Sequence, residues 1–243
     1  MEIKEAFWEK RNLGIDVCEI SISKNDTEEQ ISNNLDTLES NFKYLVAKVP
    51  INNIDSLFLL QNKHFKFIEQ IFVCSHNLNE PIFSSLQKRI LNHIGHEIMK
   101  ESERKELKNF ILDGLFKEDR ISLDSHFEKD LSNKRYLGLI EDEVSQGAEI
   151  YSLTFKGKTS GFFVARGLKN KVLFASIGGI YPKFQGFGLG LGLNYQEILL
   201  AKNLNLRKVR TIYSSNNIGA SSVHHQLAYD IENQYYVLIK HIP

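Results

Sequence analysis

A glycine-rich segment between residues 177 and 192 has the composition of an anion-binding loop. Its sequence, IGGIYPKFQGFGLGLG, is an apolar stretch, then a proline, then glycine at every second position from Gly186 to Gly192. A strand that turns through such a loop into a helix can hold phosphate, because bare N–H groups face the anion in front of the positive helix end. We expect residues 186–190 to bind a phosphate group; a plain flexible turn is the weaker alternative.

Two common nucleotide-binding motifs do not fit the chain. A dinucleotide fingerprint needs its third glycine at position 191 or 193, where the chain has Leu191 and Leu193. The next predicted strand also lacks the acidic residue that would bind a ribose. A P-loop ending at Gly157-Lys158-Thr159 needs an earlier glycine where Ser152 stands. Neither motif accounts for the glycines.

The glycine-rich segment resembles the acetyl-CoA signature of the GNAT superfamily of N-acetyltransferases. The pattern is Ile180-x-Pro182-x-x-Gln185-Gly186-x-Gly188-x-Gly190. In that family an apolar-x-Pro strand end is followed by Gln/Arg-x-x-Gly-x-Gly/Ala, which wraps the pyrophosphate. The resemblance implies acetyl-CoA as co-substrate, bound without a metal. The cofactor-binding residues that it implies are Ile180, Gln185, Gly186, Phe187, Gly188, Leu189 and Gly190.

A second segment, residues 217–229, resembles the part of the GNAT pattern that follows the next strand. It reads NIGASSVHHQLAY, against Asn-x-x-Ala-x-x-Leu-Tyr-x-x-x-Gly-Phe, with Ala228-Tyr229 in place of Gly-Phe. The resemblance implies that Asn217 contacts the pantetheine arm. His224 stands where the family has the tyrosine that protonates the thiolate. A thiol titrates near about 8.5 and imidazole near about 6.5, so a histidine can serve as that acid; a structural surface histidine is the alternative.

No general base is evident in the sequence. The family often carries a glutamate on the strand before the loop, but residues 171–178, KVLFASIG, contain none. Ser176 could orient a water molecule at the acceptor but is too weak a base alone. Either a base comes from elsewhere in the chain or the amine arrives neutral.

Scattered residues resemble a two-part GNAT subgroup, the N-acetyltransferases of dTDP-fucosamine and other dTDP-amino-dideoxyhexoses. They are Phe7-Trp8, Leu13-Gly14, the strand at 17–22, Lys48-Val49-Pro50 and residues 119–124. The subgroup implies a nucleotide-linked amino-6-deoxyhexose as acceptor, in surface polysaccharide synthesis, and leaves a homodimer open. Arg120 could bind a phosphate of this acceptor, but pairing with Asp124, four residues on, is the favoured interpretation.

Other functions stay open at this point. A GNAT enzyme could act on a peptide or a small-molecule amine, and a non-catalytic acyl-CoA-binding protein would need no base. Cys74-x-His76 and His93-x-x-His96 do not have a known zinc spacing, so we expect no metal site.

The predicted elements form an α/β (α+β) protein of GNAT fold, with a mixed, mostly antiparallel sheet and a truncated GNAT-like N-terminal unit. We divide the chain into residues 1–118 and 119–243, the latter being the acetyl-CoA-binding domain. Residues 64–73 weakly resemble residues 228–237, which suggests that the halves are related. We expect strands at 17–23, 44–50, 65–73, 149–155, 159–166, 171–180, 207–213 and 231–241, and helical segments at 27–40, 54–62, 81–117, 124–145, 188–203 and 217–227.

Composition excludes several classes of function. The 243 residues include 30 Lys+Arg and 30 Asp+Glu, so there is no basic field for nucleic acid or a membrane surface. Two cysteines are too few for a disulfide framework. The charged start, MEIKE, does not resemble a signal peptide, and no apolar run is long enough to span a membrane. We therefore expect a soluble, cytoplasmic protein.

Overall fold

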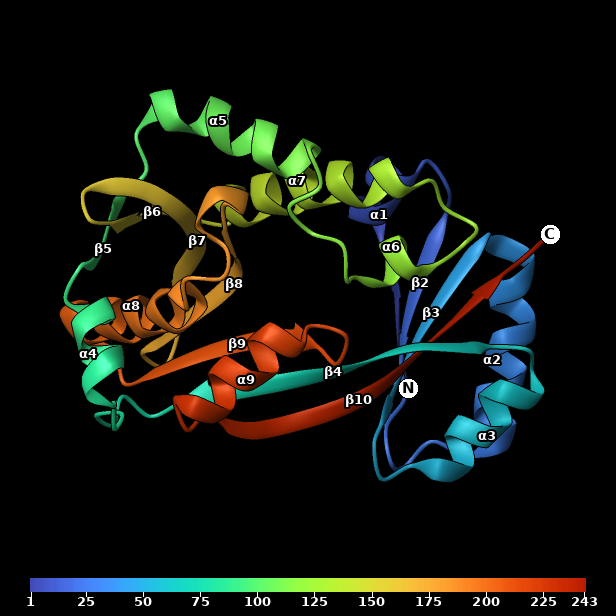
Figure 1. Cartoon of the computed structure of the whole chain (residues 1–243). Helices are drawn as coiled ribbons and strands as arrows, with labels where there is room; N and C mark the ends of the chain where they lie inside the picture. The colour runs from blue at the N-terminus through green and yellow to red at the C-terminus, as the bar shows by residue number, and fades with distance from the viewer.

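The computed structural model describes the whole chain, Met1 to Pro243, and Figure 1 shows helices packed against one long sheet. A capping box starts the first long helix: Thr27 Oγ1 accepts the N–H of Gln30 at 3.2 Å, and the N–H of Thr27 donates to Gln30 Oε1 at 3.1 Å. The elements of the first half are β1 (Glu2–Glu5), α1 (Phe7–Leu13), β2 (Val17–Ser21), α2 (Glu28–Asn41), β3 (Tyr44–Pro50), α3 (Ile54–Asn62), β4 (Lys66–His76), α4 (Ser85–Leu91), β5 (Ile94–Ile98) and α5 (Glu101–Leu112).

The second half follows the order predicted for it. The hairpin turn between the first two of its strands has positive φ at both Lys156 (50°) and Gly157 (74°), as a tight turn between twisted strands requires. The elements are α6 (Arg120–Leu123), α7 (Lys129–Ser145), β6 (Glu149–Phe155), β7 (Lys158–Leu168), β8 (Val172–Ile180), the 3₁₀ turn η1 (Pro182–Phe184), α8 (Leu189–Asn203), β9 (Lys208–Ser214), α9 (Ile218–Gln226) and β10 (Asp230–His241).

The sheet has ten strands in the order β1-β2-β3-β10-β4-β9-β8-β7-β6-β5. The pairs β2–β3 and β8–β9 are parallel, and all others with a recorded register are antiparallel. This confirms the predicted mixed, mostly antiparallel sheet. None of the helices combines the length and the apolar content needed to cross a membrane.

One predicted helical stretch, residues 81–117, is wrong in its middle. Asn92 ends α4, and Ile94–Ile98 form β5, which pairs antiparallel with β6. Ile90, Leu91 and Ile94 have helical spacing, but the free edge of β6 supplies hydrogen bonds that residues 94–98 satisfy as a strand. Tertiary pairing therefore overrides the local pattern.

The two halves exchange strands. β10 of the second half lies between β3 and β4 of the first, and β4 in turn pairs with β9. The residues just before β4 and β10 are similar: His64 and Ala228 both have positive φ, 67° and 56°. In each case the next N–H closes the preceding helix, from Phe65 to Leu60 O and from Tyr229 to His224 O. The resemblance noted between residues 64–73 and 228–237 thus coincides with equivalent positions in the sheet.

Helices cover both faces of this sheet. α8 and α9 pack on β8, β9 and β4 through residues such as Leu200, Val209 and Leu227. On the opposite face α5 and α7 cover β6 to β8. The first half is enclosed by α2 and α3 on one face and by α1, α6 and α7 on the other. On the face covered by α1, α5, α6 and α7, the part of β4 and β9 that lies between these helices is left partly open.

The side chain of Arg120 lies in a buried ionic cluster between α1 and the sheet and does not form the predicted pair with Asp124. Its guanidinium pairs with Glu9, and Arg135 donates to the same carboxylate at 2.7 and 2.8 Å. Burial alone would raise the pKa of Glu9, but the two arginines outweigh it and hold the pKa below its ordinary value of 4.5. Arg120 is thus enclosed by protein groups, and we leave it out of the ligand site.

Glu197 on α8 makes stability depend on pH. It is 4% exposed, its Oε2 has no partner, and burial raises its pKa from 4.5 to about 8. The folded state therefore favours the protonated acid, whose stabilisation is complete below pH 4.5 and lost as pH rises through about 8. We expect Glu197→Gln to raise the free energy of unfolding by about 1–3 kcal/mol more at pH 8 than at pH 5. Urea denaturation at both pH values checks this; an equal effect would contradict it.

Candidate functional site

The parallel strands β8 and β9 separate partway along their length. Val172–Ala175 pair with Lys208–Thr211, and the ladder ends there. A bulge causes the separation: Ala175 and Ile177 pair with consecutive residues of β7, so Ser176 is the extra residue. Its hydroxyl donates to the carbonyl of Val164 at 3.4 Å. Because a bulge bends its strand, the edge of β8 that faces β9 has no strand partner beyond Ala175, while the other edge stays paired with β7.

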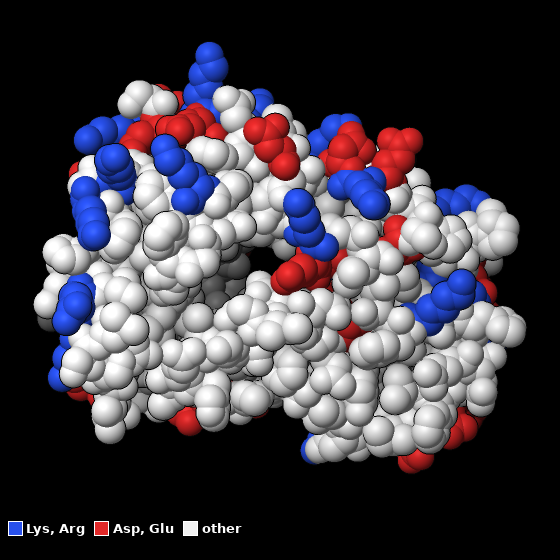
Figure 2. Space-filling view, in the orientation of Figure 1, with Lys and Arg blue, Asp and Glu red and all other residues white.

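Figure 2 shows a deep hollow near the middle of the molecule, in the region where Figure 1 places the end of β8 and the connection between α5 and α6. This connection packs on the end of β8, since a Cβ on Gly179 would lie 3.1 Å from the side chain of Leu115. The connection between α5 and α6 thus covers one side of the end of β8, next to the place where β8 and β9 separate.

The glycine loop presents free N–H groups beside this opening. Gly186 and Gly188 have φ of 84° and 73°, which L side chains rarely adopt. The backbone N–H groups from Gly186 to Gly190 have no acceptor in the protein, and no side chain caps α8. No protein atom lies within 4 Å of a Cβ built on Gly186 or Gly188. The loop can therefore bind an anion at the N-terminus of a long helix.

The other residues predicted to contact a cofactor take different positions. Gln185 Nε2 donates to Ile180 O at 3.1 Å, which ties the loop to the strand end. Phe187 is 57% exposed, whereas Leu189 is buried, so only the backbone of Leu189 can face a ligand. A Cβ on Gly190 would contact Val223 of α9 at an ordinary 3.6 Å. The structure therefore places Gly186, Phe187 and Gly188 at the loop surface.

Asn217 and His224 lie on α9, which packs beside α8. Asn217 caps the helix, since its Oδ1 accepts the N–H of Ala220 at 2.9 Å, and its Nδ2 makes no hydrogen bond within the protein. His224 is 5% exposed and lies against Tyr213, with ring centroids 4.7 Å apart and the ring planes tilted by 31°. Its Nδ1 lies 2.7 Å from Ala220 O, and its buried Nε2 has no partner. Burial lowers the pKa of this imidazole, which favours the neutral form protonated at Nδ1.

Glu69 is the functional candidate that the sequence analysis missed. It lies on β4, in the first half of the chain, and projects from the face opposite α8 and α9, two residues from Ile71, which pairs with Ser214 at the end of β9. It is 4% exposed and forms no ion pair. Burial raises the pKa of this carboxyl, although the nearby Ser214 hydroxyl and Arg120 partly oppose the shift. Glu69 shares its face with apolar Ile71 and Val73, an unusual position for a carboxylate, while a bulge at Ile68 turns Phe67 to the other face.

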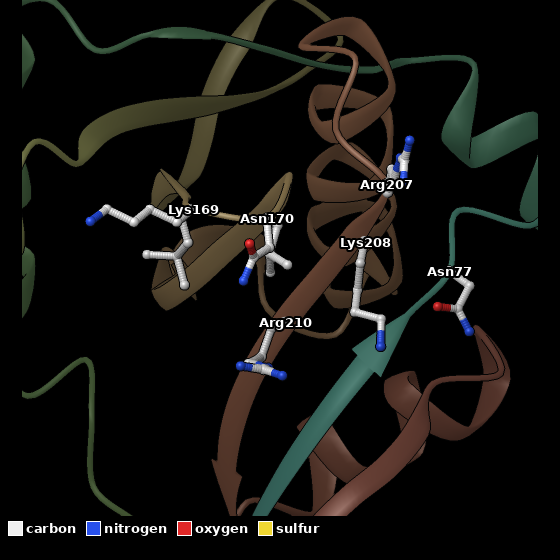
Figure 3. Close-up of a pocket in the computed structure, with 8 residues that line it drawn as sticks. Asn77, Lys169, Asn170, Arg207, Lys208 and Arg210 are labelled. Carbon is white, nitrogen blue, oxygen red and sulfur yellow. The ribbon is translucent and has the colours of Figure 1, made fainter.

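The face that carries Glu69 continues along β9. Alternate residues of a strand share a face, so Ser214, Ile212 and Arg210 follow one another on it. A cavity of about 750 Å³ lies over Ile71, Val73 and Ile212. Ile212 is 43% exposed. Farther along, Arg210 and Lys208 line a second cavity (Figure 3). The face therefore changes from acidic to apolar to cationic.

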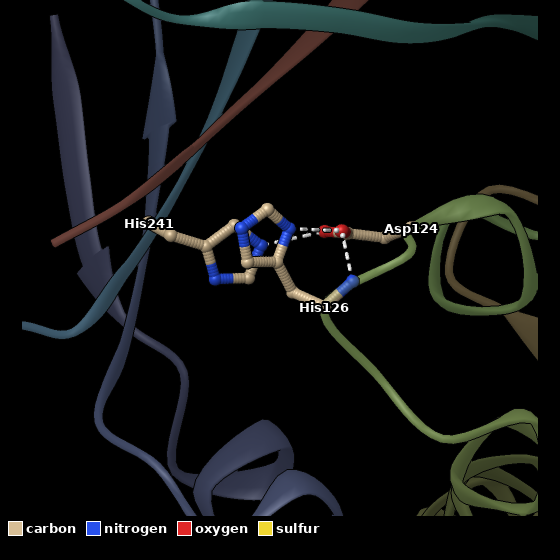
Figure 4. A group of neighbouring side chains, drawn as sticks. All are labelled: Asp124, His126 and His241. Carbon is tan, nitrogen blue, oxygen red and sulfur yellow. Dashed lines mark hydrogen bonds and ion pairs between the residues drawn. The ribbon is translucent and has the colours of Figure 1, made fainter. Parts of the chain in front are cut away.

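Asp124, His126 and His241 form a separate cluster between the α6–α7 connection and β10 (Figure 4). Nδ1 of His126 and Nε2 of His241 lie 3.1 and 2.7 Å from different oxygens of Asp124. The two imidazole rings are stacked, with centroids 4.1 Å apart and an interplanar angle of 16°. Ring nitrogens of nearly parallel rings do not point at one common centre, so the cluster is better explained as a hydrogen-bonded tie than as a metal site.

The separated strands, the glycine loop and the strand order together decide the fold. The chain has the GNAT fold. A GCN5-related N-acetyltransferase from Sphaerobacter thermophilus superimposes with a TM-score of 0.57 at 14% identity, over 88% of this chain and 65% of that one. A tandem GNAT protein from the clavulanic acid biosynthesis pathway gives 0.56 at 10% identity, over 93% and 75%.

A third similar structure is the glucosamine N-acetyltransferase region of a fungal multi-domain GH3 β-N-acetylglucosaminidase. It has a TM-score of 0.66 at 11% identity and covers 93% of this chain and 30% of that one. No family model matches the sequence, and no curated protein matches it. The chain thus spans about two thirds of the Sphaerobacter protein and less than a third of the fungal one, and the likeness at these identities is one of fold.

Proposed function

We propose that this protein moves an acetyl group from acetyl-CoA to the amino group of a nucleotide-linked amino-6-deoxyhexose, with dTDP as the nucleotide, for surface polysaccharide synthesis. The observation that carries acetyl-CoA binding is the run of unpaired N–H groups from Gly186 to Gly190, beside strands that have separated. Such groups suit a pyrophosphate without a metal. The separated edge of β8 and the free Nδ2 of Asn217 suit the amide-bearing pantetheine arm.

The chain supplies groups for each part of a direct transfer. The amine attacks the thioester carbon, a C–N bond forms, and the C–S bond breaks to release the thiolate of CoA. N–H groups on the unpaired edge of β8, between Ser176 and Ile180, can stabilise the developing oxyanion. Since a thioester is already activated, positioning of the amine contributes much of the rate.

Glu69 supplies the base that residues 171–178 lack. A buried carboxylate with a raised pKa is a stronger base than an exposed one, and Glu69 forms no ion pair that would hold its charge. Ser214 lies beside it and can carry a hydrogen bond toward the acceptor. The proton of the attacking amine therefore passes to the carboxylate of Glu69, directly or through one water molecule.

An amino sugar is the acceptor class with most support. The fungal region of similar fold is a glucosamine N-acetyltransferase. The first half of this chain, where residues resemble the dTDP-sugar subgroup, contributes the strand of Glu69 and borders the acceptor face. A contribution of the first half to the acceptor site is consistent with a two-part sugar acetyltransferase. The choice of dTDP as the nucleotide depends on the resemblance alone.

His224→Phe should lower kcat about tenfold with little change in the affinity for acetyl-CoA, because the variant removes an imidazole that, in its protonated form, can give the sulfur a proton from Nε2, but leaves the glycine loop intact. If His224 is this acid, kcat of the natural chain should also fall as pH rises through the lowered pKa of the imidazole. Steady-state kinetics against pH checks both. His225→Phe, on the exposed side of α9, is the matched control. Unchanged turnover in His224→Phe would remove His224 from the reaction.

The proposed function is tested with acetyl-CoA and a panel of amines: dTDP- and UDP-linked amino sugars, free glucosamine, and a peptide with a free amino terminus. Release of free thiol is the readout, and mass spectrometry identifies the acetylated product. We expect release with the dTDP-linked 6-deoxy amino sugar. Release with the peptide alone would overturn the acceptor assignment, and CoA binding without release from any amine would favour a non-catalytic acyl-CoA-binding protein.

A further inference from the structure

A cationic cavity lies where β8 and β9 begin, at the opposite end of these strands from the glycine loop. Its volume is about 610 Å³, and few of its lining residues are apolar. Such a lining suits an anion better than an apolar ligand. The polar lining residues, labelled in Figure 3, are Asn77, Lys169, Asn170, Arg207, Lys208 and Arg210.

The cavity shares a sheet face with the proposed acceptor site. Arg210, Ile212 and Ser214 are alternate residues of β9, and Ser214 lies beside the strand of Glu69. The strand covers about 13 Å from Arg210 to Ser214, at about 3.3 Å per residue. Ile212 between them is 43% exposed. An elongated ligand with its amine near Ser214 can therefore reach Arg210 by following β9.

Glu232 offsets part of the positive charge without removing it. Its two oxygens lie 2.8 Å from Lys208 Nζ and 2.8 Å from Arg210 Nη2. The side chain of Arg210 is still 41% exposed. In Figure 3 Lys208 and Arg210 project to the same side of β9, whereas Lys169 and Arg207 point away from them. Lys208 and Arg210 are thus placed for contact, and the other two cations add to the local field.

We propose that Arg210 and Lys208 bind the diphosphate of the nucleotide-linked acceptor, an inference that rests on the proposed function. A diphosphate lies between the sugar and the nucleoside, so cations at one end of the face and Glu69 at the other give the ligand one orientation. A guanidinium can bind phosphate oxygens through two parallel hydrogen bonds. Glu232 competes with the phosphate for both cations and so weakens the binding of any anion there.

Binding without catalysis tests this site. Isothermal titration of the full chain with dTDP, UDP and inorganic pyrophosphate, in the absence of acetyl-CoA, measures the affinity directly. Arg210→Gln should weaken dTDP binding at least about tenfold. Glu232→Gln should strengthen it, because the competing carboxylate is gone. Arg104→Gln is the matched control, since Arg104 also pairs with a glutamate, Glu101 at 3.1 Å, but lies on α5.

Two results would overturn the diphosphate site: no binding of any of the three probes, or equal affinity in the natural chain and Arg210→Gln. Failure of the proposed function looks different. If dTDP binds as expected but no amino sugar releases thiol, the anion site stands and the acetyl transfer fails. If a dTDP-linked sugar releases thiol but Arg210→Gln leaves its KM unchanged, the acetyl transfer stands and the anion site fails.

Discussion

Gly188→Val should weaken CoA binding about a hundredfold, roughly 2.7 kcal/mol, while the protein stays folded. Gly188 has a φ of 73° and stands immediately before α8. A β-branched residue resists this conformation, so the backbone would move to negative φ and turn the free N–H groups of the loop away from a pyrophosphate. Calorimetric titration with CoA measures the loss, and circular dichroism confirms that the helices persist.

Gly190→Ala separates the two reasons for which a glycine could matter in this loop. Gly190 is already helical, and a Cβ there would contact Val223 at an ordinary distance of 3.6 Å. We expect its CoA affinity to change less than about threefold, well under 1 kcal/mol. An equal loss in both variants would mean that bulk, not the positive φ of Gly188, limits binding. An unaltered affinity in Gly188→Val would mean that the loop does not hold the cofactor.

Local sequence carried most of the information about the cofactor side of the protein. The glycine loop, α8 and α9 are continuous in sequence, and their spacing predicts a strand, a loop and two helices that the structure confirms. A positive φ favours glycine, so the glycine at 188 and the N-terminus of α8 could be located together. His224 was predicted as an acid from its position after the glycine loop, and that role stays a prediction; its burial and its bond to Ala220 were not predictable from spacing.

The acceptor side depends on contacts between residues far apart in the chain, which no local pattern contains. β4 reaches the site only because the halves exchange strands, so Glu69 lies beside Ser214, 145 residues later, in a way that alternation within residues 65–73 cannot show. Arg120 failed for the same reason: its partner Glu9 is 111 residues away. The helix spacing that favoured Asp124 lost to this long-range pair, because a buried guanidinium needs a buried carboxylate.

Glu69 did leave a signal in the sequence. In residues 65–73 simple alternation puts Phe67, Glu69, Ile71 and Val73 on one face, so a carboxylate interrupts an apolar row. In the structure a bulge at Ile68 turns Phe67 to the other face, and Ile71 and Val73 stay beside Glu69. Burying a charge in such a row is costly unless it is paired or has a use. Because Glu69 has no ion pair, a catalytic role explains its position better than a structural one. The same reasoning applied to Glu197 gives a different result, since α8 holds it away from the acceptor face.

Glu69→Gln should lower kcat about a hundredfold and leave the affinity for acetyl-CoA unchanged, because the amide fills the same space but cannot accept a proton. The pH dependence gives a second signature. Glu69 must be ionised to act, so the activity of the natural chain should rise with pH through the raised pKa of this carboxyl, and the variant should lose that limb. Thiol release at saturating acetyl-CoA across a pH series measures both.

Glu197→Gln is the matched control for this experiment. Glu197 is also 4% exposed with a raised pKa, but it lies on α8 within the core cluster of that face. Glu197→Gln should therefore stabilise the fold more at pH 8 than at pH 5 and leave turnover at full rate. Equal losses of turnover in the two variants would assign the effect of Glu69→Gln to general disturbance of the fold. A normal kcat in Glu69→Gln with its acidic limb intact would show that the amine loses its proton to another group, and that the raised pKa of Glu69 is only the cost of enclosing β4 between the two halves.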